Sequence, residues 1–309
     1  MNKSALAKII FVEITLILFF SSTPWQEAII SNSAIIGNAQ EIADKNELEI
    51  AFLDIGQGDA TFINFPNQEQ MLVDCGKDSN VLAALGRVMN PRDNKIDYLV
   101  ITHPDADHYG GCVDVMDRFR VKNIIYNGLR KESDQFWQYF FSVIEELDSQ
   151  GVNYLEIDQP LAFSVGGVGL SFIYPDHSIR ESQFVPGLTK ENDNNTSLVF
   201  SLKYGANNVL MTGDMEIELE KYLLAKYPSQ LPADILKVGH HGSDTSSDKD
   251  FLSAVKPRYA VISSGRGNTF GHPSRRTLRK LERINAQTLR TDEKSDILFV
   301  ITSSTLITN

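Results

Sequence analysis

One run of ten residues, Thr-His-Pro-Asp-Ala-Asp-His-Tyr-Gly-Gly at 102–111, constrains this chain more than any other segment. It follows the apolar run Tyr-Leu-Val-Ile at 98–101, so it is expected on a loop at the end of a strand. Two imidazoles and two carboxylates fall within six residues, and clustered carboxylates repel one another unless a cation lies between them. The alternative is an Asp-rich turn in which Asp107 caps the following helix. The two histidines and the strand-end position favour a divalent-metal site.

The first 39 residues differ from the rest of the chain. Lys3 and Lys8 precede an apolar segment at 9–20, and small residues follow it at 21–24. This order is typical of a secretory signal, and the apolar segment is short for a membrane span. We therefore expect residues 1–39 to be a signal peptide or a short N-terminal anchor, with a buried first helix as the other reading. The protein is then exported to the periplasm, the cell envelope or the medium. The cleavage site stays open, with 37–39 as one candidate.

In residues 47–309, short apolar runs alternate with Gly, Pro and Asn, and this pattern predicts one domain. The predicted strands are 48–54, 60–65, 70–74, 98–102, 123–126, 169–174, 196–203, 208–212, 235–238, 259–263 and 297–302. The predicted helices are 81–89, 133–149, 217–227 and 274–284. Strands cluster first and then mix with helices, and this order recurs in the second half. The pattern indicates an α/β (α+β) fold with two mixed sheets packed face to face and helices outside.

The charge balance limits the partners. The formal net charge is −11, which argues against a protein that grips long nucleic acid over a broad surface, although a local basic groove is still compatible with it. The chain has two cysteines, too few for a disulfide framework or a Cys-rich zinc module. No apolar run after the first 40 residues reaches 18 residues, so the sequence predicts no channel or transporter.

Seven further segments accompany the run at 102–111 in a fixed order. They are 52–60 (FLDIGQGDA), 72–76 (LVDCG), 194–199 (NNTSLV), 212–214 (TGD), 236–243 (LKVGHHGS), 271–273 (GHP) and 290–292 (RTD). Together they resemble the metallo-β-lactamase superfamily, in whose metal motif a histidine usually stands where Asp105 stands here. An aspartate at that position is characteristic of the branch that contains the hydrolase domain of ComEC-type DNA-uptake proteins. The resemblance spans about 48–301 and implies a four-layer αββα sandwich with its site at one edge.

The resemblance assigns metal ligands position by position. The expected ligands are His103, Asp105, Asp107, His108, Asp214 and His240. The first two serve one metal, the next two serve the other, and Asp214 bridges both. The final histidine is either His240 or His241. We expect His240 because it comes first after the apolar strand, and His241 would then face the substrate.

One position departs from the wider superfamily. A third histidine usually falls between the first motif and the bridging aspartate, but the one histidine in that interval is His177, which we expect in an exposed turn. Residues 194–197 hold the corresponding place, as in the ComEC-type branch. One metal is then bound by fewer protein groups or by an amide oxygen. Oxygen ligands weaken the preference for zinc, so we expect two divalent metal ions, Zn²⁺ first and Mn²⁺ as the alternative.

Roles follow for the other motif residues. The expected catalytic residues are Asp107, His241 and His272, and the expected substrate-binding residues are Asn195, Ser197 and Ser243. Asp54, Asp59 and Asp74 are either turn residues or carboxylates that orient a ligand histidine. Ser247 with Asp250 is expected to cap the next helix. Cys75 and Cys112 flank site motifs, and both a disulfide and buried free thiols stay open.

The expected reaction is hydrolysis. Two metals about 4 Å apart share a hydroxide, lower its pKa and hold an anionic electrophile, which suits a phosphodiester. The ComEC-type resemblance implies a nuclease that acts on incoming DNA. We therefore expect an exported metal-dependent phosphodiesterase or nuclease, working alone or beside membrane uptake components. The alternatives are an envelope esterase, such as a phosphorylcholine esterase or another ester or lactam hydrolase, and a non-catalytic envelope protein that retains the fold.

Overall fold

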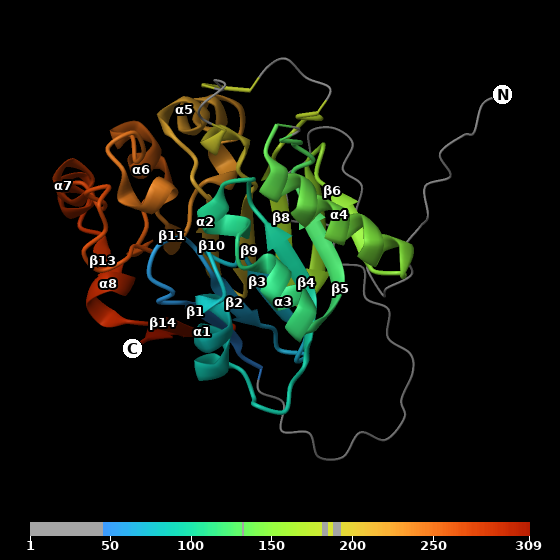
Figure 1. The fold of residues 1–309 in the computed structure, drawn as a ribbon. Coiled ribbons are helices and arrows are strands. Elements are labelled where there is room, and N and C mark those ends of the chain that lie inside the picture. The colour runs from blue at the N-terminus through green and yellow to red at the C-terminus, as the bar shows by residue number, and fades with distance from the viewer. Residues whose placement is uncertain (1–45, 132, 181–184, 188–192) are drawn as a thin grey trace.

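The computed structural model describes residues 46–131, 133–180, 185–187 and 193–309 (Figure 1). The expected signal peptide or anchor at 1–39 lies outside the described residues. Within the described part, none of the helices has both the length and the apolar character needed to cross a membrane.

The first sheet has eight strands in the order β15-β14-β1-β2-β3-β4-β5-β6. Its strands are β1 (Leu48–Phe52), β2 (Thr61–Asn64), β3 (Gln70–Val73), β4 (Lys95–Ile101), β5 (Arg120–Tyr126), β6 (Asn153–Glu156), β14 (Ile297–Ile301) and β15 (Leu306–Thr308). The strands from β3 to β6 run parallel to one another, and the remaining neighbours pair antiparallel. The last two strands of the chain therefore complete the sheet that the first strand begins.

The second sheet has seven strands in the order β13-β12-β11-β10-β9-β8-β7. Its strands are β7 (Leu161–Val165), β8 (Val168–Tyr174), β9 (Val199–Tyr204), β10 (Asn207–Met211), β11 (Ile235–Lys237), β12 (Tyr259–Ile262) and β13 (Gln287–Arg290). Here the strands from β10 to β13 run parallel, and β7 to β10 pair antiparallel. Each sheet is thus half antiparallel and half parallel.

Three buried clusters separate four layers. One fills the space between the sheets, with Phe52, Phe172, Phe200 and Phe299 among its members. The second packs α1 (Asn80–Val88), α3 (Cys112–Arg118) and α4 (Gln135–Ser149) on the first sheet. The third packs α5 (Ile217–Lys226), α6 (Lys249–Val255) and α7 (Arg275–Arg283) on the second sheet, and Figure 1 shows the short α2 (Ala106–Tyr109) between the two helix groups. The expected αββα sandwich is confirmed.

Some elements differ from the sequence prediction. The sequence did not indicate β6, β7, β13 and β15, which are short and partly exposed, so they lack the apolar run that reveals a central strand. The predicted strand at 196–203 begins only at Val199, because Asn194–Thr196 forms a 3₁₀ turn. The cap predicted at Ser247 is wrong: Asp248 caps α6 by accepting from the backbone N–H of Asp250.

The parallel halves of both sheets point their carboxyl ends to the same edge of the sandwich. In α/β sheets such an edge collects the loops that carry functional side chains. A hydrogen bond of 2.9 Å from the Leu198 N–H to the Thr102 carbonyl ties the two sheets together there. The loops after β3, β4, β10, β11 and β12 all emerge at this edge.

Candidate metal centre

Most of the expected ligands lie close together at this edge. His103 follows β4, Asp107 and His108 lie on α2, and Asp214 follows β10. His241 lies in the 3₁₀ turn η3 (Gly239–Gly242) that follows β11. These side chains form overlapping groups whose ligand atoms lie within 4.8 Å of one another, and we call them the donor cluster: His103, Asp107, His108, Asp214 and His241.

The distances within the donor cluster suit a metal ion. The Oδ2 atom of Asp214 lies 3.3 Å from Nε2 of His108 and 3.3 Å from Nε2 of His241, and Asp107 Oδ2 lies 3.4 Å from Nε2 of His241. Ligand atoms that sit tetrahedrally at 2.0–2.1 Å from one ion are about 3.3 Å apart. The spacing of these donors is therefore the edge length of a tetrahedral zinc site.

The ring nitrogens that face away from the donor cluster are all engaged. His108 Nδ1 lies 2.8 Å from the Asp74 carboxylate, and His241 Nδ1 lies 3.1 Å from the Ser263 carbonyl oxygen. Thr102 Oγ1 donates to Asp74 Oδ2 at 2.7 Å, which leaves it to accept from His103 Nδ1 at 3.1 Å. Because the partner of each Nδ1 accepts, each ring donates from Nδ1, which makes Nε2 the atom that can bind a metal once it has lost its proton.

The inward atoms have no other partner. Nε2 of His103, His108 and His241 and Oδ1 of Asp214 are buried without a hydrogen bond in the described part of the protein. A buried polar atom without a partner costs free energy, so these imidazole nitrogens, which fall into two groups that share Asp214, need a cation. The residues present therefore fit a divalent metal.

The pKa values in the donor cluster also indicate a site for a cation. Burial alone would raise the pKa of Asp214, but His241 and His108 outweigh it and hold that pKa well below its usual range. Burial would lower the pKa values of both histidines, but Asp214, helped by Asp74 and Asp59, raises them well above 6.5. The excess negative charge of the cluster thus requires positive charge, from protons or from metal.

His241, and not the expected His240, lies in the donor cluster. His241 is buried and lies among the donors, whereas Nδ1 of His240 points to Glu216 at 3.0 Å and to Thr245 at 3.2 Å. Both residues adopt left-handed backbone conformations, with φ of 46° and 50°. Such conformations are costly for residues other than glycine and collect at functional sites. This unusual turn is what sends the second histidine, rather than the first, into the cluster.

Asp105 lies at the rim of the site. Its Oδ2 is 3.6 Å from His103 Nε2, and its Oδ1 accepts from Lys131 Nζ at 2.7 Å. Burial would raise its pKa, but His103 and then Lys131 hold the pKa of Asp105 well below its usual range. Asp105 is thus a carboxylate close to His103, and its other oxygen is bound by Lys131. The sequence analysis did not predict a role for this lysine.

Asp74 orients a histidine through a hydrogen bond, and Asp59 lies within ion-pair distance of another histidine. Asp74 binds His108 as described, and Asp59 Oδ1 lies 3.3 Å from His241 Nδ1. Asp54 is a turn residue whose side chain accepts from the Gly56 N–H. Gly58, beside Asp59, has φ of +108°, and a Cβ there would lie 2.1 Å from the Asp107 carbonyl oxygen. A glycine is therefore required for this loop to approach the metal motif.

The residues expected to bind substrate lie outside the lining of the cavity. Asn195, Ser197 and Ser243 are buried and do not line the cavity beside the donor cluster. Ser197 Oγ accepts from the Asp214 N–H at 3.0 Å, and Asn195 Oδ1 accepts from the Glu216 N–H at 2.8 Å. These side chains fix the backbone under the site. The amide oxygen of Asn195 is thereby engaged, and His177, hydrogen-bonded to Asp176, also lies outside the donor cluster.

A cavity of about 300 Å³ opens onto the donor cluster. It is lined by Gln57, Lys77, Asp105, Ala106, Asp107, Asp214, His240, His241, Phe270 and His272. His272 is thus placed at the site, as expected, and burial followed by the charge of His240 lowers its pKa. Gln57, Lys77 and Phe270 were not predicted as site residues. Their only signal in the sequence was a place within a motif, for Gln57, or directly beside one, for Lys77 and Phe270.

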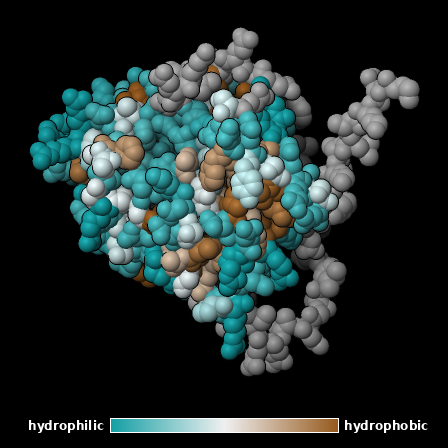
Figure 2. Space-filling view, in the orientation of Figure 1, coloured by the Kyte–Doolittle hydropathy of each residue, from teal (hydrophilic) through white to brown (hydrophobic). Residues whose placement is uncertain are grey.

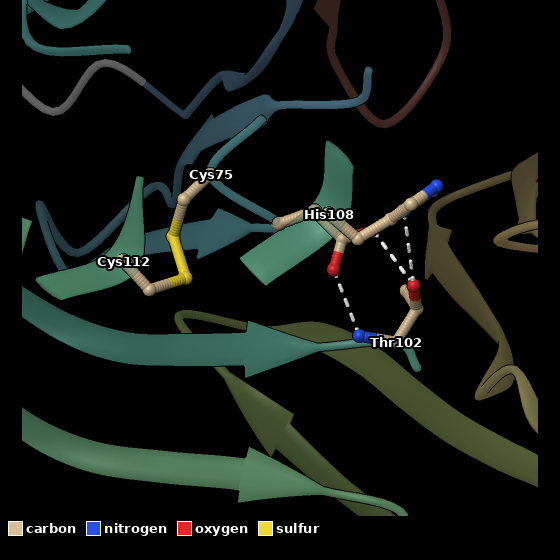
Figure 3. Close-up of a disulfide and its surroundings, with 5 residues drawn as sticks. Cys75, Thr102, His108 and Cys112 are labelled. Atoms are coloured by element: carbon tan, nitrogen blue, oxygen red, sulfur yellow. Dashed lines mark hydrogen bonds and ion pairs between the residues drawn. A yellow bond between two sulfur atoms is a disulfide. The ribbon is translucent and has the colours of Figure 1, made fainter. Parts of the chain in front are cut away.

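The two cysteines form a disulfide beside the donor cluster (Figure 3). Cys75 follows Asp74, and Cys112 begins α3 directly after the metal motif. The Cys75 N–H also donates to the His108 carbonyl at 2.7 Å. The question left open by the sequence is answered in favour of a disulfide, which ties the segment carrying Asp74 to the segment carrying His108.

The family and the relatives of the chain agree with this geometry. Residues 53–266 match the family model described as the Metallo-beta-lactamase superfamily. The chain is 28% identical over 272 residues to "ComE operon protein 3" of Bacillus subtilis (strain 168), covering 82% of this chain and 33% of that protein. It is 28% identical over 282 residues to "Competence protein ComA" of Neisseria gonorrhoeae, covering 89% of this chain and 35% of that protein. The resemblance to the ComEC-type branch is confirmed, and the chain spans about a third of the length of these relatives.

Among solved structures, CmlA, a diiron beta-hydroxylase from Streptomyces venezuelae, shares the fold. The TM-score is 0.51 at 12% sequence identity, over 82% of this chain and 54% of that chain.

Proposed function

The chain belongs to the metallo-beta-lactamase superfamily, and from that premise we propose that it is an exported, metal-dependent phosphodiesterase or nuclease of the ComEC type. The observation that carries the proposal is the donor cluster, in which three imidazole Nε2 atoms and Oδ1 of Asp214 are buried without a hydrogen bond and fall into overlapping groups that share Asp214 or His108. This arrangement suits divalent metal and hydrolysis of an anionic ester.

We assign the residues to two metal positions. His103 and Asp105 would hold one ion, Asp107, His108 and His241 the other, and Asp214 would bridge them. The mixed nitrogen and oxygen donors suit Zn²⁺, with Mn²⁺ as the alternative. When bound, such ions lower the pKa of water and neutralise the charge of a phosphoryl group.

The chain itself positions and protonates the substrate. Lys77 and Gln57 line the cavity and supply donors to phosphoryl oxygens, while Ser197 holds the backbone of Asp214 in place. We assign proton transfer to the leaving oxygen to the imidazole of His272, which lines the same cavity.

One observation supports a phosphodiester as the substrate, and another supports export of the protein. Two similar proteins are named "Competence protein ComA" and, in Haemophilus influenzae, "Recombination protein 2", and these names point to DNA. The Cys75–Cys112 disulfide suits an oxidising compartment, in agreement with the signal-like pattern at 1–39. We further propose that the protein works beside membrane uptake components.

A second candidate is the hydrolysis of a small ester of the cell envelope. The net charge of −11 and the small cavity favour a compact substrate over a long polyanion.

One set of assays tests both candidates. The purified protein, loaded with Zn²⁺ or Mn²⁺, is incubated with linear DNA, bis-p-nitrophenyl phosphate and p-nitrophenyl-phosphorylcholine, with Asp214→Asn as the control variant. Metal-dependent cleavage of DNA and of the simple diester, lost in the variant, supports the proposal. Cleavage of the phosphorylcholine ester alone supports the second candidate, and failure to bind any divalent metal contradicts both.

A further inference from the structure

Basic residues are concentrated in one segment of this acidic chain. Between Arg266 and Arg283 there are six Arg and Lys residues against a single Glu, although the whole chain has a net charge of −11. Five of the six are exposed: Arg266, Arg275, Arg276, Arg279 and Arg283. Figure 2 shows a mostly hydrophilic surface at the left of the molecule, where α7 lies. The segment follows β12 and passes the cavity before it forms α7.

The inner face of α7 is fixed to the site loop. Thr277 Oγ1 donates to the Ser243 carbonyl at 2.7 Å, and Lys280 Nζ donates to the Ser246 carbonyl at 3.1 Å. Leu281 is fully buried below them. Because this face is held against the loop that carries His241, the opposite face of the helix is turned outward.

The outer face carries a row of three arginines. Arg275, Arg279 and Arg283 are four residues apart, so they lie one above another on the helix. Within the described residues, none of the three forms an ion pair with a carboxylate. Like charges at this spacing repel and weaken a helix. The row is therefore not neutralised by carboxylates of the described residues, and an external anion is a partner it suits.

An exposed aromatic ring lies on the loop that leads into α7 and lines the cavity at the donor cluster. Phe270 lines the cavity, is 66% exposed, and lies parallel to the His272 ring, with 6.1 Å between centroids and 16° between planes. Asn268 fixes the loop: its amide donates to the Gly265 and His272 carbonyls, and its Oδ1 accepts from the His272 N–H. A large ring held in water at the mouth of a cavity offers a flat apolar face to a ligand.

We infer that the segment from Arg266 to Arg283 binds a single strand of nucleic acid beside the site. One base stacks on Phe270, and the phosphates on one side of the scissile diester follow the row of Arg275, Arg279 and Arg283. The inference rests on the proposed phosphodiesterase function and adds to it the form of the substrate. A single strand is required because only an unpaired base exposes its face to an aromatic ring, and stacking with a basic track is how such strands are bound.

The test measures binding without turnover. The full chain, freed of metal with a chelator, is titrated against a fluorescein-labelled thymidine oligonucleotide, and anisotropy is followed at several salt concentrations. Replacing Arg275, Arg279 and Arg283 by Gln weakens binding at least tenfold and reduces the salt slope by about two, since each single-strand phosphate contact contributes about 0.7. The matched control replaces three exposed basic residues elsewhere, Arg92, Lys122 and Lys203, by Gln, and binding changes less than twofold.

Phe270 is tested with a second ligand. Phe270→Ala weakens binding of the thymidine strand by roughly 5-fold to 150-fold, the range of base stacking on an aromatic side chain, while Phe270→Trp retains it. An abasic strand of the same length loses the dependence on Phe270 but keeps the dependence on the arginines.

Three outcomes overturn the inference. They are equal losses in the arginine and control variants, an unchanged affinity in Phe270→Ala, and arginine-dependent binding to phosphatidylglycerol vesicles without binding to the strand. Hydrolysis of bis-p-nitrophenyl phosphate by the unsubstituted, metal-loaded protein is measured in parallel. If the diester is cleaved and the strand is not bound, the inference falls while the proposed function stands; without cleavage the proposed function falls.

Discussion

Lys237 and Asp59 form an ion pair of 2.6 Å in which both side chains are at most 5% exposed. The second oxygen of Asp59 lies 3.3 Å from His241 Nδ1, so the buried lysine at the end of β11 reaches the donor cluster through one carboxylate. Burial would raise the pKa of Asp59, but Lys237 and His241 hold it well below its usual range. The pair keeps Asp59 charged beside His241.

Removing one partner of this pair is expected to be costly. Lys237→Met leaves the carboxylate of Asp59 buried and unpaired, and such losses cost about 3–5 kcal/mol. Urea unfolding of the metal-free protein measures the free energy. The double variant Lys237→Met/Asp59→Asn removes both charges and is expected to lose less than the single variant. Two results would contradict this prediction. In one, the single and double variants are equally stable, and in the other, Lys237→Met unfolds at the same urea concentration as the unsubstituted protein.

The adjacent histidines form a matched pair for testing the ligand assignment. His241→Ala removes a donor and is expected to weaken metal binding by more than the roughly 10- to 100-fold loss typical of an outer hydrogen-bonding partner. His240→Ala alters the same strained turn but leaves the donors in place, so metal affinity is expected to change little. Competition titration with a coloured chelator reports both affinities. A larger loss in His240→Ala would reverse the assignment.

The disulfide is expected to stabilise the fold. Its two cysteines are 37 residues apart, and closing a loop of that length stabilises a folded chain by about 2–4 kcal/mol. The variant Cys75→Ser/Cys112→Ser should therefore unfold at lower urea concentration than the oxidised protein and at a concentration close to that of the protein in reductant. Equal midpoints for the oxidised protein and the variant would contradict the prediction.

Acid sensitivity is expected from Asp176, which lies away from the donor cluster. Its carboxylate accepts from Lys226 Nζ at 2.6 Å, from Tyr227 at 2.8 Å and from Tyr222 at 2.9 Å. Burial would raise the pKa of Asp176, but Lys226, His177 and the two tyrosines lower it from 3.8 to about 2. A lowered folded pKa gives stability that is present above pH 3.8 and is lost as the pH falls through about 2.

The Asp176→Asn variant isolates this contribution. It is expected to be less stable than the unsubstituted protein by up to about 2 kcal/mol at neutral pH, because one pKa unit corresponds to about 1.4 kcal/mol and partial contact with solvent reduces the total. The difference should shrink between pH 4 and pH 2 as the native carboxylate takes up its proton. Thermal unfolding of both proteins over this pH range measures the difference in stability. A difference that stays constant with pH would show that the Asp176 carboxylate is not the source of acid sensitivity.

The sequence alone determined the architecture and the position of the site. Central strands such as β4 and β11 are buried on both faces, so they appear in the sequence as apolar runs, and the run at 102–111 is attached to the end of one of them. Edge strands such as β6 and β15 were missed because they are stabilised by pairing with a neighbour that is remote in sequence or by a turn, and their own residues carry little apolar signal.

Only the tertiary structure decided which side chains converge. The order His240 then His241 favoured the first as the ligand, but two left-handed residues in succession turn the second one inward. Asn195 and Ser197 were expected to meet substrate, but the packing of η1 (Asn194–Thr196) directs them to the backbone of Glu216 and Asp214. Residue types report which chemistry is available, whereas the direction of a side chain depends on backbone dihedrals and on neighbours from other strands. These neighbours meet only when both sheets have formed.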